Sequence, residues 1–466
     1  MTLALPTLAL DTRSVACSFI RTAMLLLCAQ SQQPSIGSPA CPSNAEVEGC
    51  LISGNIELDI GARALRLYYL PPMAMASLAL LSFLLFWHIP SITEALGPVE
   101  ADIQRPDGLC ALLVNPVEGY ACREYTVQTD DQFLVGVQRV SKKEYLGKSR
   151  GPVFVLHGIL LGGDVWFLNL PEQSLVFMLA DQGYDVWVGN TRTTRFSYGH
   201  VKYTKKDKGF WDWSVDELGE YDLSAMMGLV QSQTNQKLHY IGYSQASQQA
   251  FAAFSQGKLV DMVSKVVFVA PVAYINHVNS PIATLAGSLY IDRLFQILHV
   301  YEFSTTFRKK EVVDIICRAT ASGCFKNWIS IFTGNNCCLN VSRRVIIDTY
   351  ETQATSTKNL VHLAQQLRKK TFAKYDYGFW GNIMTYGRFS PPAYDLSKVP
   401  TSNTLFIHGG ADALADPKDV AHLFSLLPNG GSYPVSFLPE YAHIDFILGT
   451  NANQLVYKQI LDFLAS

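Results

Sequence analysis

The sequence Leu238-His239-Tyr240-Ile241-Gly242-Tyr243-Ser244-Gln245-Ala246 joins a short apolar run to an alanine-rich segment. The run has the composition of a buried strand, and the segment at 245–254 has that of a helix. Small residues two positions before and two after Ser244 are needed where strand and helix backbones pass close to a serine. In this strand–turn–helix context the sequence predicts a nucleophile elbow, which exposes Ser244 Oγ at the carboxyl edge of a sheet.

Strand and helix patterns alternate on both sides of this motif. Short apolar runs bounded by glycines or turn residues predict strands at 151–156, 184–188, 238–241, 265–269, 404–407 and 435–437, and two strands within 125–140. Helices are predicted at 175–182, 215–231, 245–254 and 454–464. This alternation indicates an α/β fold with a mostly parallel central sheet, whose core is formed by residues 105–270 and 400–466.

Residues 271–399 break the alternation, with clustered cysteines and many aromatic residues. One amphipathic helix is predicted here, because Leu360, Leu363 and Leu367 recur at helical spacing. The basic residues 368–370 follow at the end that the helix dipole favours. We therefore expect this segment to be a helical lid inserted between two strands of the sheet.

Two further residues complete a candidate catalytic set. Asp412 lies just past the predicted strand at 404–407, and His443 lies in the loop after the next strand. The order Ser244, Asp412, His443 is the one expected of the α/β-hydrolase fold. Asp416 also lies nearby, but it precedes Pro417 and a predicted helix, which is the pattern of a helix N-cap.

An oxyanion hole is predicted from the strand that ends in His157-Gly158. In this fold one donor comes from that loop and the other from the residue after the nucleophile, which here gives the backbone N–H groups of Ile159 and Gln245. His157 itself is interpreted as a packed core residue without a catalytic role.

The composition of the chain argues against several classes of protein function. Of 466 residues, 48% are hydrophobic, and 37 basic against 39 acidic residues give a net charge of −2. This balance provides no electrostatic case for binding nucleic acid. The ten cysteines show no CxxC spacing and no nearby histidine, so we expect neither a metal site nor a small disulfide scaffold.

An uncharged apolar run, Ala74–Ile89, lies unusually far from the start of the chain. It is short for a membrane span, which needs about 20 residues, and suits the core of a signal peptide. We expect translation to start normally at Met73 or Met75 and residues 73–95 to act as a signal peptide, with 1–72 absent from the mature protein. Two alternatives stay open, a single-pass membrane anchor and a weak signal around 23–29.

Six segments carry a resemblance to a known family: HGILLGGDVWF, LADQGYDVWVGNTRTTRFSYGH, FWDWSVDELGEYDL, IGYSQA, GGADALADPKDV and YAHIDFI. They lie within 114–464 and resemble the acid lipases of gastric and lysosomal type and their plant relatives, whereas 1–72 match nothing in that family. The resemblance implies an α/β-hydrolase fold with a lid, entry into the secretory pathway and action on neutral-lipid esters at a lipid–water interface. We expect no cofactor, no binding of nucleic acid and no obligate protein partner.

The resemblance also implies individual site residues. Ser244, Asp412 and His443 match the family's triad, and Ala246 stands where the family has glycine. Asn340 begins the sequon Asn340-Val341-Ser342, in a region where family members often carry a glycan. Cys317 and Cys324 resemble the disulfide of the family's lid.

The expected mechanism is an acyl-enzyme one. His443 takes the proton of Ser244, whose Oγ attacks the ester carbonyl, while Asp412 holds the imidazole tautomer. Triacylglycerol and steryl esters are both candidate substrates. Two other functions stay open: an acyltransferase with the same triad, and a non-catalytic lipid-binding relative, for which Ala246 is the supporting feature.

Overall fold

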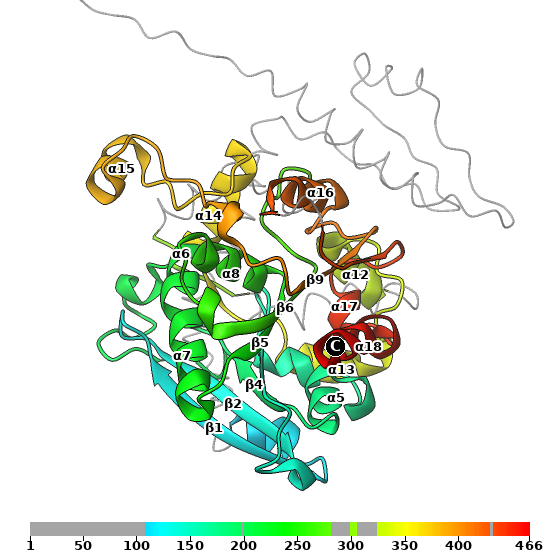
Figure 1. Ribbon diagram of the computed structural model, residues 1–466. Coiled ribbons are helices and arrows are strands. Elements are labelled where there is room, and N and C mark those ends of the chain that lie inside the picture. The colour runs from blue at the N-terminus through cyan, green and yellow to red at the C-terminus, as the bar shows by residue number, and fades with distance from the viewer. Residues whose placement is uncertain (1–107, 198, 281–298, 305–323, 429–431) are drawn as a thin grey trace, which may run out of the picture. The chain divides into compact units, whose positions relative to one another are not determined.

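Eight strands form the central sheet, in the order β1-β2-β4-β3-β5-β6-β9-β10 (Figure 1). The computed structural model describes residues 108–197, 199–280, 299–304, 324–428 and 432–466. The six strands β4, β3, β5, β6, β9 and β10 pair in parallel, whereas β2 pairs antiparallel with β4 and with the edge strand β1. The bounds are β1 (Tyr120–Gln128), β2 (Leu134–Lys142), β3 (Pro152–Leu156), β4 (Asp185–Gly189), β5 (Leu238–Tyr243), β6 (Val263–Val269), β9 (Thr404–Gly409) and β10 (Val435–Leu438). The predicted mostly parallel sheet is confirmed.

The sheet is buried on both faces, as its wholly apolar strand β3 shows. In β3, Val153 and Val155 belong to one core cluster, while Phe154 and Leu156 belong to the other. Successive side chains of a strand point to opposite faces, so each cluster fills one side of the sheet. This explains why the strand reads as an uninterrupted apolar run rather than an alternating one.

Helices cover the two faces (Figure 1). The predicted helix at 215–231 is a continuous helical stretch that begins at α6 (Val215–Glu217), passes through a π-helical turn and ends with α7 (Leu223–Thr234). Ser214 caps it with a capping box that includes Glu217. The other core helices are α5 (Leu175–Asp181), α8 (Gln245–Ser255), α16 (Pro417–Leu426), α17 (Asp445–Leu448) and α18 (Lys458–Ala465).

The chain between β6 and β9 holds several short elements. They are β7 (Glu302–Phe303), α12 (Cys324–Thr333), α13 (Arg344–Tyr350), β8 (Thr355–Ser356), α14 (Thr357–Lys369) and α15 (Gly378–Tyr386). Parts of the predicted lid, 281–298 and 305–323, lie outside the described residues, as do residues 1–72 and the apolar segment 73–95. Among the helices that the structure describes, none has the length and apolar composition that crossing a bilayer requires.

The predicted amphipathic helix exists as α14, but its leucine stripe is not its buried face. Leu360, Leu363 and Leu367 are only half-buried, whereas the polar residues Asn359 and His362 are fully buried. The spacing of the leucines therefore predicts the helix but not the face that it buries. Helix α14 buries its polar face because it packs against the side of α8 that carries the amides of Gln245 and Gln248.

Candidate active site

Ser244 lies at the turn between β5 and α8 in a backbone conformation that side chains rarely adopt, with φ 57° and ψ −120°. Such a conformation costs about 1–3 kcal/mol and persists only when its surroundings enforce it. Gly158 is part of that enforcement, because a Cβ built there would lie 2.8 Å from Ser244 Cβ. The side chain of Ala246 is fully buried, and its backbone carbonyl accepts a 2.9 Å hydrogen bond from the Tyr240 hydroxyl.

The structure brings together the three residues of the predicted triad. His443 Nε2 lies 2.7 Å from Ser244 Oγ, and His443 Nδ1 lies 2.8 Å from Asp412 Oδ2. Because a carboxylate only accepts, the proton of the imidazole sits on Nδ1, and Nε2 is free to accept from the serine hydroxyl. All three side chains are at least 95% buried. The sequence predicted an exposed Ser244, whereas the structure encloses it.

The loop that carries Asp412 is held by backbone contacts on both sides. Asp412 Oδ1 accepts from the N–H groups of Leu414 and Ala415, at 2.9 and 2.8 Å. The carbonyl of Thr333, the last residue of α12, accepts from the N–H groups of Ala413 and His443, at 3.3 and 3.0 Å. One carbonyl from the chain between β6 and β9 thus ties the acid loop to the histidine loop.

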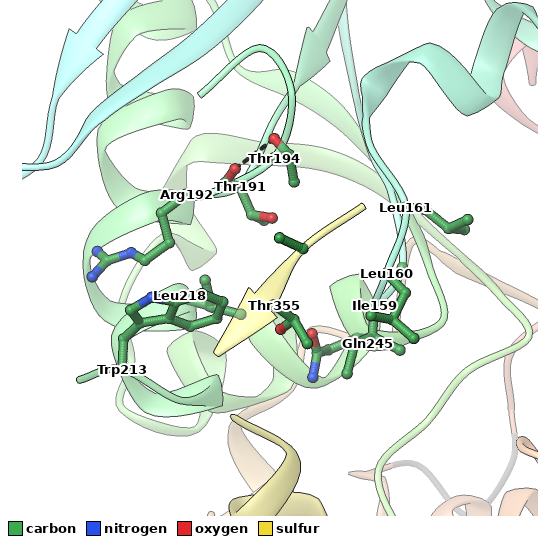
Figure 2. Close-up of a pocket in the computed structure, with 12 residues that line it drawn as sticks. Ile159, Leu160, Leu161, Thr191, Arg192, Thr194, Trp213, Leu218, Gln245 and Thr355 are labelled. Atoms are coloured by element: carbon green, nitrogen blue, oxygen red, sulfur yellow. Dashed lines mark hydrogen bonds between the residues drawn. The ribbon is translucent and has the colours of Figure 1, made fainter. Parts of the chain in front are cut away.

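A small pocket is lined by Gln245, the residue after Ser244, and by residues 158–161 of the loop after β3 (Figure 2). Ile159 and Gln245, the two predicted oxyanion donors, both line it. Gln245 is the first residue of α8, where a backbone N–H precedes the intrahelical ladder. The rest of the lining is mixed, with apolar side chains (Leu160, Leu161, Trp213 and Leu218) and polar ones (Thr191, Arg192, Thr194 and Thr355). The pocket therefore brings both predicted donor residues into a lining of mixed polarity.

Gln353 fixes the loop that bears Ile159, a role that the sequence did not predict. Its N–H donates 2.8 Å to the carbonyl of Leu160, and its Nε2 donates to both oxygens of Asp164, at 2.6 and 2.8 Å. Burial raises the pKa of Asp164 to about 7, although Arg195 nearby favours the charged form. Asp164 stands in the quoted HGILLGGDVWF segment, whereas Gln353 lies in an irregular stretch that carries no motif.

His157 has a structural role, as the sequence interpretation held. It is 1% exposed, its Nδ1 donates to the carbonyl of Gly158 at 2.8 Å, and its Nε2 accepts from the N–H of Thr191 at 3.2 Å. Burial lowers the pKa of His157 to about 4, so the ring is neutral. It joins the loop after β3 to the loop after β4.

Helix α14 reaches the site through amide pairs. Gln245 and Asn359 exchange side-chain hydrogen bonds of 3.1 and 3.2 Å, and Gln248 donates 2.9 Å to Gln366. Buried amides need such partners, which explains why the polar face of α14 is the one that packs on α8. This part of the predicted lid is therefore fastened to the nucleophile helix.

The sequence indicated one candidate disulfide, Cys317–Cys324, and one candidate glycosylation site, Asn340. Cys317 and the side chain of Cys324 lie outside the described residues, while the structure contains two disulfides that were not predicted, Cys110–Cys122 and Cys337–Cys338. Asn340 is 5% exposed, and its amide donates to Asn169 and Gln173, at 3.2 and 3.4 Å. A glycan on this nitrogen would disturb that pairing, and glycosylation of Asn340 stays a prediction.

Metal binding was not expected. Among the described residues, no three His, Cys, Asp or Glu side chains are grouped so that they could hold a metal ion.

The sequence matches two family models, described as a partial alpha/beta-hydrolase lipase region at residues 117–170 and as the alpha/beta hydrolase fold at 151–308. Together with the sheet, these matches define an α/β-hydrolase. Triacylglycerol lipase 1 and triacylglycerol lipase 2 of Arabidopsis thaliana are both 40% identical to this chain, covering 77% and 76% of it and 90% and 87% of the relatives. Gastric triacylglycerol lipase of Rattus norvegicus is 35% identical, over 74% of this chain and 89% of the relative. The chain belongs to the acid lipase family and is a lipid ester hydrolase.

Proposed function

We propose that this protein hydrolyses triacylglycerol by an acyl-enzyme mechanism in which Ser244 is the nucleophile, His443 the general acid and base, and Asp412 the residue that orients the histidine. The observation that carries the proposal is the continuous relay from Asp412 Oδ2 through His443 to Ser244 Oγ, with contacts of 2.8 and 2.7 Å. Both distances are within the range that general-base activation of a serine requires.

The steps follow from the atoms present. His443 Nε2 takes the hydroxyl proton while Ser244 Oγ attacks the ester carbonyl, and the oxyanion is stabilised by the N–H groups of Ile159 and Gln245. His443 then gives the proton to the leaving alcohol, and water attacks the acyl-serine with the same base. Each oxyanion donor contributes about 3–4 kcal/mol in comparable sites.

The relatives reported above support a triacylglycerol substrate, because they are named triacylglycerol lipases. Steryl esters remain a second candidate substrate. A panel of emulsified triacylglycerol, steryl ester and phospholipid separates these substrates by the ratio of kcat/KM.

Labelling with a fluorophosphonate probe tests the mechanism. Mass spectrometry is expected to find the adduct on Ser244, and Ser244→Ala is expected to lose the label and to retain less than about a thousandth of the turnover. Absence of labelling in the wild type would favour the non-catalytic, lipid-binding alternative. Product analysis with and without an added alcohol distinguishes a hydrolase from an acyltransferase.

We further propose that the protein matures in the secretory pathway. The Cys110–Cys122 disulfide supports this, because such bonds persist in oxidising compartments. Mass spectrometry of the native N-terminus is expected to find a start near residue 95, and a protein that still carries residues 1–72 would contradict the proposal.

A further inference from the structure

Helix α15 and its flanking residues, which we call the α15 hairpin (377–389), expose an unusual number of large apolar side chains. These are Tyr377 (39% exposed), Phe379 (53%), Trp380 (75%), Met384 (87%) and Phe389 (67%). Figure 1 shows α15 beyond α14, at the margin of the described fold. Contiguous apolar surface of this kind marks an interaction site, whereas single exposed apolar residues do not.

The outward placement of these rings is built into the hairpin. Asn382 is the buried residue of α15, and its amide donates to Asp376 Oδ1 at 2.7 Å and to the carbonyl of Phe389 at 3.1 Å. Asn382 Oδ1 also accepts from the N–H of Tyr377 at 3.0 Å. Polar contacts thus close the hairpin from within, which leaves its apolar side chains on the outside.

The exposed rings also form an ordered cluster. Phe379 stacks on Phe389 with ring centroids 4.8 Å apart and planes at 13°, and it meets Trp380 edge-on at 4.9 Å. A cluster held by its own contacts presents a preformed apolar surface, so that little side-chain entropy is lost when that surface is covered.

We propose that the α15 hairpin is the surface by which this protein adsorbs to the lipid–water interface, with Trp380, Met384 and Phe389 inserted at the boundary between headgroups and acyl chains. The inference rests on the proposed function, since it assigns a surface to the phase that holds the substrate. Amphipathic helices bind this boundary through aromatic and aliphatic side chains, and tryptophan favours it because of its polar N–H.

The charges around the hairpin favour a lipid surface over a second copy of the chain. Helix α15 itself carries no charged side chain, and Arg388 next to Phe389 is exposed. Lys370 is exposed as well, and neither cation forms an ion pair within the described part of the chain. Asp376, the acid before Tyr377, is paired with Lys369. Apolar side chains flanked by cations complement anionic headgroups above an acyl phase, whereas self-association would bring like charges together.

The connection of the hairpin to the candidate active site also favours a lipid surface as the binding partner. The hairpin follows α14 directly, and α14 pairs through Asn359 with Gln245, the residue after the nucleophile. Adsorption through 377–389 therefore attaches the lipid surface to the helix that pairs with the residue after the nucleophile.

Binding is tested in the Ser244→Ala background, so that lipid is not consumed. Phe379→Ser, Trp380→Ser and Phe389→Ser are combined, and partitioning is measured by flotation with phosphatidylcholine vesicles containing phosphatidylglycerol and with triolein emulsion. The matched control combines Leu146→Ser and Val201→Ser, which are 57% and 60% exposed and lie outside the hairpin. We expect the triple variant to bind on the order of 100-fold more weakly and the control to bind as the parent does.

Activity in the wild-type background separates this inference from the proposed function. The triple variant is expected to keep its turnover of a dissolved short-chain ester and to lose activity on emulsified triolein. Equal binding of the triple variant and the parent would overturn the inference. So would dimerisation of the parent that the triple change abolishes while lipid binding persists. A parent that binds lipid through the hairpin but turns over neither ester would refute the function and leave the inference standing.

Discussion

The hydroxyl of Tyr243 donates a 2.8 Å hydrogen bond to the backbone carbonyl of His443, and the two rings lie 5.1 Å apart. Tyr243 precedes the nucleophile in the chain, so this bond links the serine turn directly to the histidine loop. The triad is held by the same strand end from which Ser244 projects.

Tyr243→Phe should therefore lower kcat several-fold with little change in KM, because the histidine loop loses its tie to the elbow. The free energy of unfolding should fall by about 1 kcal/mol, as expected for one buried hydrogen bond. Tyr457→Phe is the matched control, since its buried hydroxyl donates 3.0 Å to the carbonyl of Ile447, a bond that involves no residue of the triad. Equal kcat losses in the two variants would contradict a specific role for Tyr243.

Gly334 tests the contact between α12 and the acid loop. It has φ +99°, and a Cβ there would lie 2.1 Å from the carbonyl oxygen of Ala411, next to Asp412. Gly334→Ala should displace this loop and lower turnover on the order of tenfold, in addition to the cost of the backbone strain. Gly257→Ala is the control, because Gly257 has φ +71° with nothing within 4 Å of the added Cβ. Denaturant unfolding and kcat are measured for both, and wild-type turnover in Gly334→Ala would refute the coupling.

Asp164 should make stability depend on pH. Burial raises its pKa from 3.8 to about 7, so the folded state binds a proton that the unfolded state has released between these two values. Stability should therefore fall as pH rises from about 4 to about 7. Asp164→Asn should flatten this part of the curve of unfolding free energy against pH. A variant with the same slope as the wild type would show that Asp164 is not the group responsible.

The parallel sheet was predictable because β3, β5 and β6 are apolar runs too short for helices and bounded by turn residues. The site was predictable because Ser244, Asp412 and His443 each follow a strand end, where the carboxyl ends of parallel strands meet. Each of these signals is local to a few residues.

The supporting residues gave no such signal. Gln353 contacts Asp164, 189 residues away in the chain, and Thr333 contacts the loops of Ala413 and His443, 80 and 110 residues away. Both residues lie in a segment that has no regular period. Helix α14 was predicted from its leucines, yet the amides of α8 determine which face it buries. The face that α14 buries follows from the surface of α8 against which it packs, and the spacing of its leucines does not reveal it.

The most direct test compares two nearby acids. Asp412 faces His443, whereas Asp416 caps α16 by accepting from the N–H of Lys418 at 2.8 Å, and its other oxygen accepts from Asn279 at 2.7 Å. Asparagine caps helices about as well as aspartate, so Asp416→Asn should cost about 1 kcal/mol of stability at most and leave turnover within a few-fold.

The measurement is kcat for a dissolved ester in Asp412→Asn and Asp416→Asn, with folding checked by thermal unfolding. Asp412→Asn should misorient the imidazole of His443 and lower kcat by about 10⁴-fold, as an equivalent change does in serine proteases. A folded Asp412→Asn variant with near wild-type kcat, beside an inactive Asp416→Asn, would contradict the assignment of Ser244, His443 and Asp412 as the catalytic relay.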